Sequence, residues 1–184
     1  MSCSSIVQYY VNQDLSGEDI LSLTGKKPIV YQELSKIKNI NQLLGPEKFS
    51  IILYEVNSSS EGHWTCLYRQ ENNNMLTWFD SYGLDVDTED LYAPTNAKLP
   101  KYLTQLIQKS GEKYQFNKID YQSKNQASTC GRWASCSAKI FRYMDLDQVD
   151  IFLKNNDSAW LNPDRIVTML TIYTLNQISQ FFNK

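Results

Sequence analysis

The chain has 184 residues and 42% of them are hydrophobic, which is enough to build one core in a single domain spanning residues 1–184. Its formal net charge is −2 and its basic residues are dispersed, which argues against nucleic acid and membrane surfaces as partners. Four cysteines without a C-x-x-C pair and a single histidine form no zinc motif, so we expect no metal, no cofactor and free thiols in a reducing compartment. No segment approaches a membrane span and the N-terminus lacks a signal peptide, so we expect a protein that is not secreted.

The first third of the chain predicts short elements separated by turn residues. Ser16 and Asp19 have the spacing of a helix cap, and Gly25 ends the helix that they begin. Gly45 and Pro46 form a second clear stop. In chain order we expect a strand or a packed arm at 6–11, a helix from Ser16 to Gly25, an extended and then helical stretch at 28–34, and a segment at 39–44 that ends at the second stop.

The centre of the chain predicts three consecutive strands, at residues 49–56, 63–69 and 75–80. The last two form a hairpin in which His63 begins one strand and Asp80 ends the other. A two-residue loop at 71–72 would place these side chains directly opposite, and a four-residue loop at 71–74 would make them diagonal neighbours. Both registers put them on one face with Cβ atoms within about 8 Å, whereas an odd-length loop would separate them.

The second half of the chain predicts helices around one further strand. We expect an α+β fold in which a central, mainly antiparallel sheet is flanked by helices on both sides. The expected elements are an acidic surface excursion at 84–97, an amphipathic helix at 99–109, a strand at 117–122, a polar loop at 123–129, a helix from Cys130 with apolar residues up to Met144, a short helix at 149–153, and a helix from Asn162 to about Phe182.

Cys130 is predicted to open a helix directly after the polar loop. The first N–H groups of a helix have no partner within it and the dipole is positive there, so a thiolate, the form that attacks carbonyl carbon, is favoured. Gly131 would let backbone or substrate approach the sulfur. The alternative is that Cys130 is a small buried apolar residue, as we expect for Cys66 and Cys136.

His63 is the only histidine, so it is the single candidate for a general base that acts near neutral pH. Asp80 would hold the imidazole tautomer and favour the imidazolium. The alternatives are a structural histidine and an aspartate that only ends a strand in the turn Asp-Ser-Tyr-Gly. The shared sheet face favours the functional interpretation of the pair.

Two glutamine amides compete to bind the oxyanion that forms when a thiolate attacks an amide. Gln122 would end a strand and be held rigidly, which favours it, whereas Gln126 lies in the loop. Either could instead be a solvated loop amide. Five aromatic residues lie close to these positions in the sequence, most of them expected in the core and one or two at a substrate cleft: Trp64, Trp78, Phe79, Tyr82 and Trp133.

Four motifs occur in a characteristic order: Gly62-His63-Trp64, Phe79-Asp80-Ser81-Tyr82-Gly83, Gln122, and Cys130-Gly131-Arg132-Trp133. Together they resemble the adenovirus-type and Ulp1-type cysteine proteases, over roughly residues 49–145, and in detail the maturation proteases of virophages and related double-stranded DNA viruses. The resemblance implies the fold of those enzymes, a triad of His63, Asp80 and Cys130, and an oxyanion hole that contains Gln122. The gap of eight residues between Gln122 and Cys130 is longer than the usual six or seven, so Gln126 stays open as the alternative.

The same resemblance implies a cysteine endopeptidase that processes viral capsid or scaffold precursors, often after small residues, in the virion and the host-cell interior. It also admits a peptide activator, on which the sequence is silent. Alternatives on the same scaffold are a protease that removes ubiquitin-like modifiers and an acyltransferase. A catalytically dead binding module is disfavoured because it would have no need of the complete His, Asp and Cys set.

Overall fold

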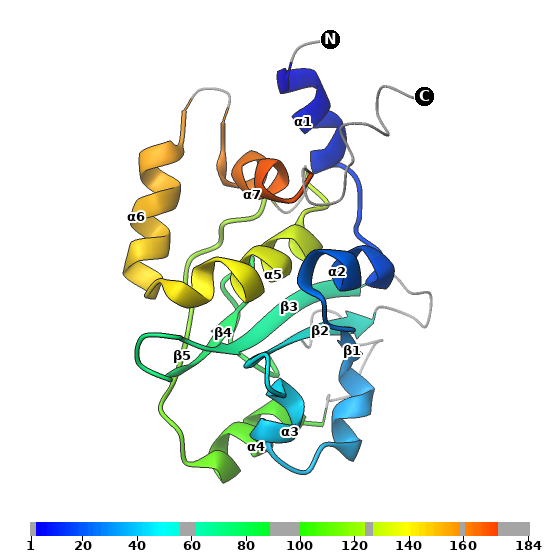
Figure 1. The fold of residues 1–184 in the computed structure, drawn as a ribbon, viewed down its shortest axis with the longest axis vertical. Coiled ribbons are helices and arrows are strands. Elements are labelled where there is room, and N and C mark those ends of the chain that lie inside the picture. The colour runs from blue at the N-terminus through cyan, green and yellow to red at the C-terminus, as the bar shows by residue number, and fades with distance from the viewer. Residues whose placement is uncertain (1–2, 56–61, 89–99, 124–126, 159–160, 173–184) are drawn as a thin grey trace.

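The computed structural model describes residues 3–55, 62–88, 100–123, 127–158 and 161–172, and its centre is a five-stranded sheet (Figure 1). The strands follow one another across the sheet in sequence order, as β1 (Ile29–Val30), β2 (Phe49–Glu55), β3 (Gly62–Arg69), β4 (Leu76–Phe79) and β5 (Tyr114–Phe116). The three central strands are antiparallel, and the short edge strands β1 and β5 pair in parallel with their neighbours. The expected antiparallel centre is confirmed, and the edges make the sheet mixed.

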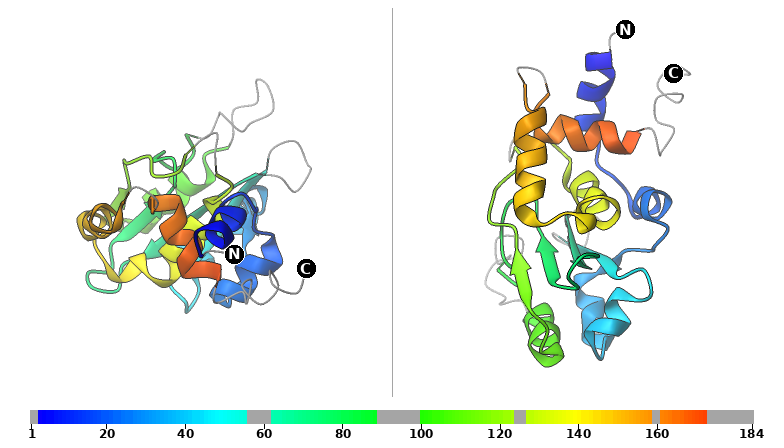
Figure 2. Two further views of the ribbon diagram at one scale, coloured as in Figure 1. Left: turned by 90° about the horizontal axis from the view of Figure 1, so that it is seen from above. Right: turned by 60° about the vertical axis from the view of Figure 1, so that its left-hand side comes forward.

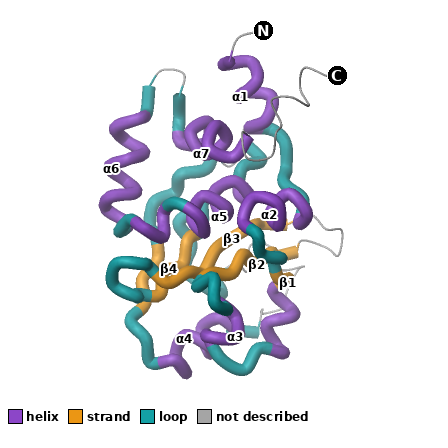
Figure 3. The backbone as a smooth tube through the Cα atoms, in the orientation of Figure 1, coloured by secondary structure: helices purple, strands orange, loops and turns teal. Residues whose placement is uncertain are grey.

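Helices cover both faces of this sheet, as predicted (Figures 1 and 3). One side carries α2, α5 and α6, and the other side carries α3, α4 and the 3₁₀ helix η1. The described helices are α1 (Cys3–Val11), α2 (Gly17–Thr24), η1 (Tyr31–Lys36), α3 (Ile40–Leu44), α4 (Tyr102–Ser110), α5 (Cys130–Lys139), η2 (Phe141–Tyr143), α6 (Leu146–Asn156) and α7 (Pro163–Ile172). Within the described ranges, no helix has the length and apolar character needed to cross a membrane.

Each face of the sheet has its own apolar core. Cys66 lies opposite Phe79 in the β3–β4 pairing, and both face α5. The next pair, Leu67 and Trp78, faces α4. This alternation follows from the two-residue period of a strand, and it explains why the strand sequences are apolar on consecutive positions rather than on alternate ones. Cys66 is therefore a core residue, as predicted.

The hairpin connection is the four-residue alternative. Arg69 pairs with Leu76, and the N–H of Gln70 donates to the carbonyl of Met75 at 3.0 Å, which leaves residues 71–74 as the turn. If the register is continued, His63 lies opposite Tyr82 and Asp80 is its diagonal neighbour. The prediction that the two side chains share a face is confirmed.

The N-terminal segment corrects the prediction of a strand or arm at 6–11. It is a helix, α1, and it packs against α7. Ile6, Val7, Tyr10 and Val11 are buried together with Ile172. Their spacing of three and four residues is the period of a helix, which the shortness of the apolar run obscured.

Two further predictions need correction. The strand expected at 117–122 is absent, because β5 ends at Phe116 and residues 117–122 are irregular. The described part of the acidic segment is not a simple surface excursion, since Asp87 is buried and its carboxylate accepts a hydrogen bond from the N–H of Thr104 at 2.7 Å. The predicted stretches at 89–97 and beyond Ile172 lie outside the described residues.

Candidate active site

Cys130 is the first residue of α5, which crosses the sheet over β3 (Figure 1). Thr129 occupies the capping position without making a capping hydrogen bond through its side chain. The first N–H groups of α5 therefore point toward the region of the sulfur without a capping side chain in front of them. Cys130 is buried to all but 9% of its surface. Its predicted place at the start of a helix is confirmed.

Gly131 is closely packed beside the nucleophile position. A Cβ on this residue would lie 3.0 Å from the Cβ of Leu15 and 3.2 Å from Cδ1 of Trp64. The indole N–H of Trp64 also donates to the carbonyl of Leu15 at 3.1 Å. The close approach predicted for Gly131 is therefore made by the protein's own side chains. Leu15 and Trp64 pack against the start of α5 at this glycine.

His63 is held between Asp80 and Tyr82. Its Nε2 lies 2.9 Å from Oδ1 of Asp80, and its ring stacks on Tyr82 with centroids 4.6 Å apart and planes 14° from parallel. Oδ1 of Asp80 also accepts the backbone N–H of Tyr82 at 2.7 Å. Because an ionised carboxylate only accepts hydrogen bonds, Nε2 carries the proton and Nδ1 is the nitrogen left for the thiol.

The pKa of His63 reflects two opposing effects. Burial of the ring lowers it, but the hydrogen bonds with Asp80 and with the side chain of Cys130, together with their negative charge, raise it well above its usual value. The imidazolium is therefore the favoured form when a thiolate stands next to it. The structure brings the three predicted side chains, His63, Asp80 and Cys130, into one hydrogen-bonded group.

Gln122 is buried beside this group, but its amide is already bonded. Its Oε1 accepts from the hydroxyl of Ser81 at 2.7 Å, and its Nε2 donates to the carbonyl of Ala127 at 2.9 Å and to the hydroxyl of Tyr82 at 3.4 Å. The backbone N–H of Gln122 donates to the carbonyl of Ser81 at 3.1 Å, so a turn contact holds it rather than a strand. An oxyanion would have to replace one of these acceptors. Gln126 lies outside the described residues.

Asn117 positions Asp80 and was not singled out from the sequence. The N–H of Asp80 donates to its Oδ1 at 2.8 Å, and its Nδ2 donates to the carbonyl of Asp80 at 2.6 Å. The side chain thus takes the place of the next strand residue, which explains why β5 stops one residue earlier. An asparagine directly after β5 was the only signal for this role in the sequence.

A cavity of about 350 Å³ is lined in part by Trp64. Trp64 also lies against Gly131, next to Cys130, so one of the predicted aromatic residues lines a cavity near the site. Its lining comes from the segment before α2, the connection between α2 and β1, β1 itself and β2: Leu15, Ser16, Lys27, Val30, Leu53 and Glu55.

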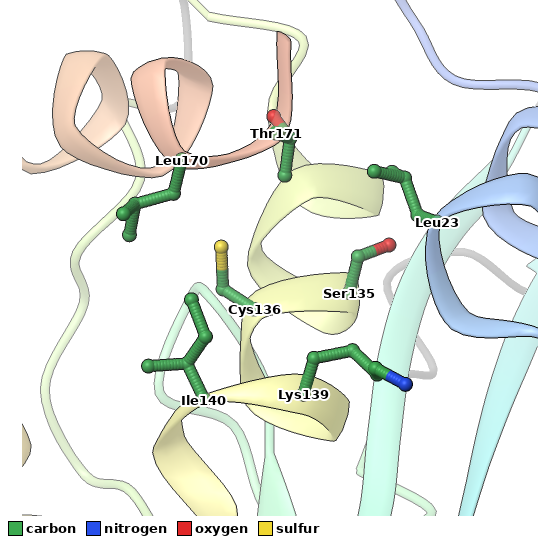
Figure 4. A pocket seen from close by; sticks show the side chains of 7 residues that line it. All are labelled: Leu23, Ser135, Cys136, Lys139, Ile140, Leu170 and Thr171. Atoms are coloured by element: carbon green, nitrogen blue, oxygen red, sulfur yellow. The ribbon is translucent and has the colours of Figure 1, made fainter. Parts of the chain in front are cut away.

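A second cavity of about 250 Å³ lies between α2, α5 and α7 (Figure 4). The sulfur of Cys136 points toward it, whereas the amine of Lys139 points away and donates to the carbonyl of Thr24 at 3.4 Å. Burial raises the pKa of the Cys136 thiol to about 12, so this sulfur stays protonated at neutral pH. Cys136 is a core residue, as predicted. Over the described residues, no group of three or more His, Cys, Asp or Glu side chains is placed to hold a metal ion.

No protein-family model matches the sequence. The chain is similar to a protein of Sputnik virophage named "Uncharacterized protein V9", with 32% identity over 177 residues that cover 90% of this chain and 98% of the relative. This likeness agrees with the virophage part of the resemblance, and it carries no information on chemistry. The identity and the nearly complete coverage of both proteins place this chain in the family of the virophage protein V9.

Proposed function

We propose that the protein is a cysteine endopeptidase in which Cys130 is the nucleophile, His63 the general base and Asp80 the residue that orients it. One observation carries the proposal: the imidazole of His63 is hydrogen-bonded to a buried carboxylate on one side and to a thiol at the start of a helix on the other. A purely structural role does not require a histidine that links an acid to a sulfur.

The geometry supports acyl transfer in two steps. Nδ1 of His63 takes the thiol proton, the thiolate adds to the scissile carbonyl carbon, and the imidazolium returns the proton to the departing amine as the C–N bond breaks. Water then adds to the thioester, His63 takes a proton from it, and the C–S bond breaks as Cys130 is protonated again. The N–H groups at the start of α5 are suited to hold the oxyanion in both steps.

We propose a viral capsid or scaffold precursor as the substrate. Two observations favour it: the resemblance of the site motifs to viral maturation proteases, and membership in a family with a virophage protein. This substrate places the protein's action in the virion and the host-cell interior. A peptide activator fits the same proposal, because Cys130 is only 9% exposed and its surroundings must open for a substrate chain.

The test is incubation of the protein with its co-encoded capsid and scaffold precursors, followed by mass-spectrometric mapping of new termini. We expect new termini with the wild-type protein, none with Cys130→Ala, and undiminished cleavage with the matched control Cys136→Ala. Release of a ubiquitin-like modifier tail with intact precursors would replace our substrate by the alternative one. Acetyl-CoA-dependent labelling of Cys130 without any cleavage would indicate the acyltransferase instead.

A further inference from the structure

A second buried carboxylate, that of Asp164, has no part in the proposed chemistry. It lies next to the nucleophile loop, the segment 123–129 that directly precedes Cys130. Asp164 is in the first turn of α7, which lies against α5 (Figures 1 and 2), and only 2% of its surface is exposed. From the sequence it reads only as an acid in the first turn of a helix, where the dipole favours it. Burial of a carboxylate is costly, so its partners must account for its place here.

Three hydrogen bonds from the nucleophile loop and the start of α5 converge on this carboxylate. Its Oδ2 accepts the backbone N–H of Ser123 at 3.0 Å. Its Oδ1 accepts the hydroxyl of Thr129 and the indole N–H of Trp133, the latter at 3.0 Å. Ser123 stands at the beginning of the loop, Thr129 directly before Cys130, and Trp133 one turn into α5. One carboxylate therefore fixes both ends of the loop and the helix that follows it.

We infer that Asp164 is a positioning residue for Cys130, which acts by holding the loop so that the sulfur meets Nδ1 of His63. The inference rests on the proposed function, since it assigns Asp164 a role for the same sulfur. The hydroxyl of Thr129 is bonded to Asp164 and makes no cap on its own helix, so the residue before the nucleophile is held from α7. Catalytic geometry of this kind tolerates displacements of well under 1 Å.

Alkylation of Cys130 by iodoacetamide tests this without any substrate. The rate is followed from about pH 5 to pH 9 by mass spectrometry of the peptide that contains Cys130, in wild type, Asp164→Asn, Thr129→Val and the double variant. An asparagine keeps one acceptor oxygen but turns an N–H donor toward Ser123 or Trp133. Thr168→Val is the matched control, because the hydroxyl of this buried α7 residue donates only to the carbonyl of Asp164 at 2.7 Å within its own helix.

We expect Asp164→Asn to slow alkylation near pH 7 about tenfold and to move the half-maximal rate to higher pH. Thr129→Val should slow it about threefold, and the double variant should be no slower than Asp164→Asn, because both changes disturb the same group of hydrogen bonds. Thr168→Val should match wild type. If Asp164→Asn does not fold, the dependence of the alkylation rate on pH in Thr129→Val alone tests the inference.

Two results would overturn the inference. Wild-type rates and pH profiles in both loop variants, with only a lower unfolding temperature, would make Asp164 a structural residue. Faster alkylation in Asp164→Asn would show that the charge of the carboxylate outweighs its hydrogen bonds, since removing a negative charge favours the thiolate. Cleavage of precursor is measured in parallel. Its absence in wild type contradicts the proposed function, whereas unchanged alkylation contradicts only the role of Asp164.

Discussion

Two regions of the molecule, the start of β3 and the start of η1, each hold a ring that is hydrogen-bonded to a buried carboxylate. In the Asp80 cluster (His63, Asp80, Tyr82 and Asn117) the ring is an imidazole, and in the Asp87 cluster (Tyr31, Asp87 and Thr104) it is a phenol. Both acids are held by backbone N–H groups as well as by the ring. The two clusters thus share the same kinds of contact. They differ in whether the ring can exchange its proton.

The phenol of Tyr31 keeps its proton under all ordinary conditions. Burial and the hydrogen bond to Asp87 raise its pKa far above the usual value for tyrosine. Asp87 also accepts the N–H of Thr104 in the first turn of α4, so the cluster ties η1, the acidic segment and α4 together. The imidazole of His63 instead contacts a thiol, and its hydrogen bonds with Asp80 and Cys130 raise its pKa well above the usual value although burial lowers it. A buried acid and its ring partner thus mark a site only where a third group can exchange the proton.

The largest expected effect on cleavage comes from removing the ring of His63, which contacts the sulfur. His63→Ala should reduce precursor cleavage by about 10⁴-fold or more, to the level of Cys130→Ala, because no other base is available for the thiol. Circular dichroism should show that both variants stay folded. A His63→Ala protein that retains substantial cleavage would place the chemistry elsewhere.

Loss of the true oxyanion donor should cost roughly 10²-fold in kcat. We expect this for Gln122→Ala and a smaller loss for Gln126→Ala, measured with the same precursor. Gln122 also holds Ala127 through its amide, so its variant must be checked for a normal unfolding temperature. A larger loss in Gln126→Ala would reverse the assignment.

Asp80→Ala should retain part of the activity, with a loss between 10- and 100-fold, since Asp80 orients the base without touching the substrate. Asp87→Asn, the matching change in the Asp87 cluster, should leave kcat unchanged and lower only the unfolding temperature. Equal losses of activity in the two variants would remove the distinction between the clusters.

Tyr31→Phe should destabilise the fold by about 1–3 kcal/mol, because Asp87 loses a buried donor and the N–H of Tyr102 loses its acceptor. Urea denaturation measures this change. Cleavage by the folded variant should equal that of wild type, and a loss of activity would mean that the Asp87 cluster also acts on the site.

The pH dependence of stability should separate the clusters as well. His63 has a raised pKa in the folded state, so its contribution is complete below its unfolded pKa of about 6.5 and is lost as pH rises through the raised value. The difference in unfolding free energy between wild type and His63→Gln should therefore shrink as the pH rises above about 6.5. The difference between wild type and Tyr31→Phe should stay constant over that range.

Local patterns in the sequence determined much of what positions the site. Caps and glycines located α2 and α3, because those signals act within one turn. The polar loop followed by an apolar helical stripe located Cys130 at the start of α5. The hairpin spacing predicted that any even loop would put His63 and Asp80 on one face, because strands have a period of two, and the structure supplied the four-residue loop. The α+β class followed from the order of these elements.

Only the tertiary structure decided which polar residues hold that arrangement in place. In place of the predicted strand, the side chain of Asn117 makes two hydrogen bonds to the backbone of Asp80. Asp164, on a helix far along the chain, accepts hydrogen bonds from Ser123 and Thr129. Asp87 is buried in a segment whose acidity suggested the surface. These contacts join residues separated by tens of positions, so no short pattern encodes them; they form because a buried polar group must find a partner wherever the fold supplies one.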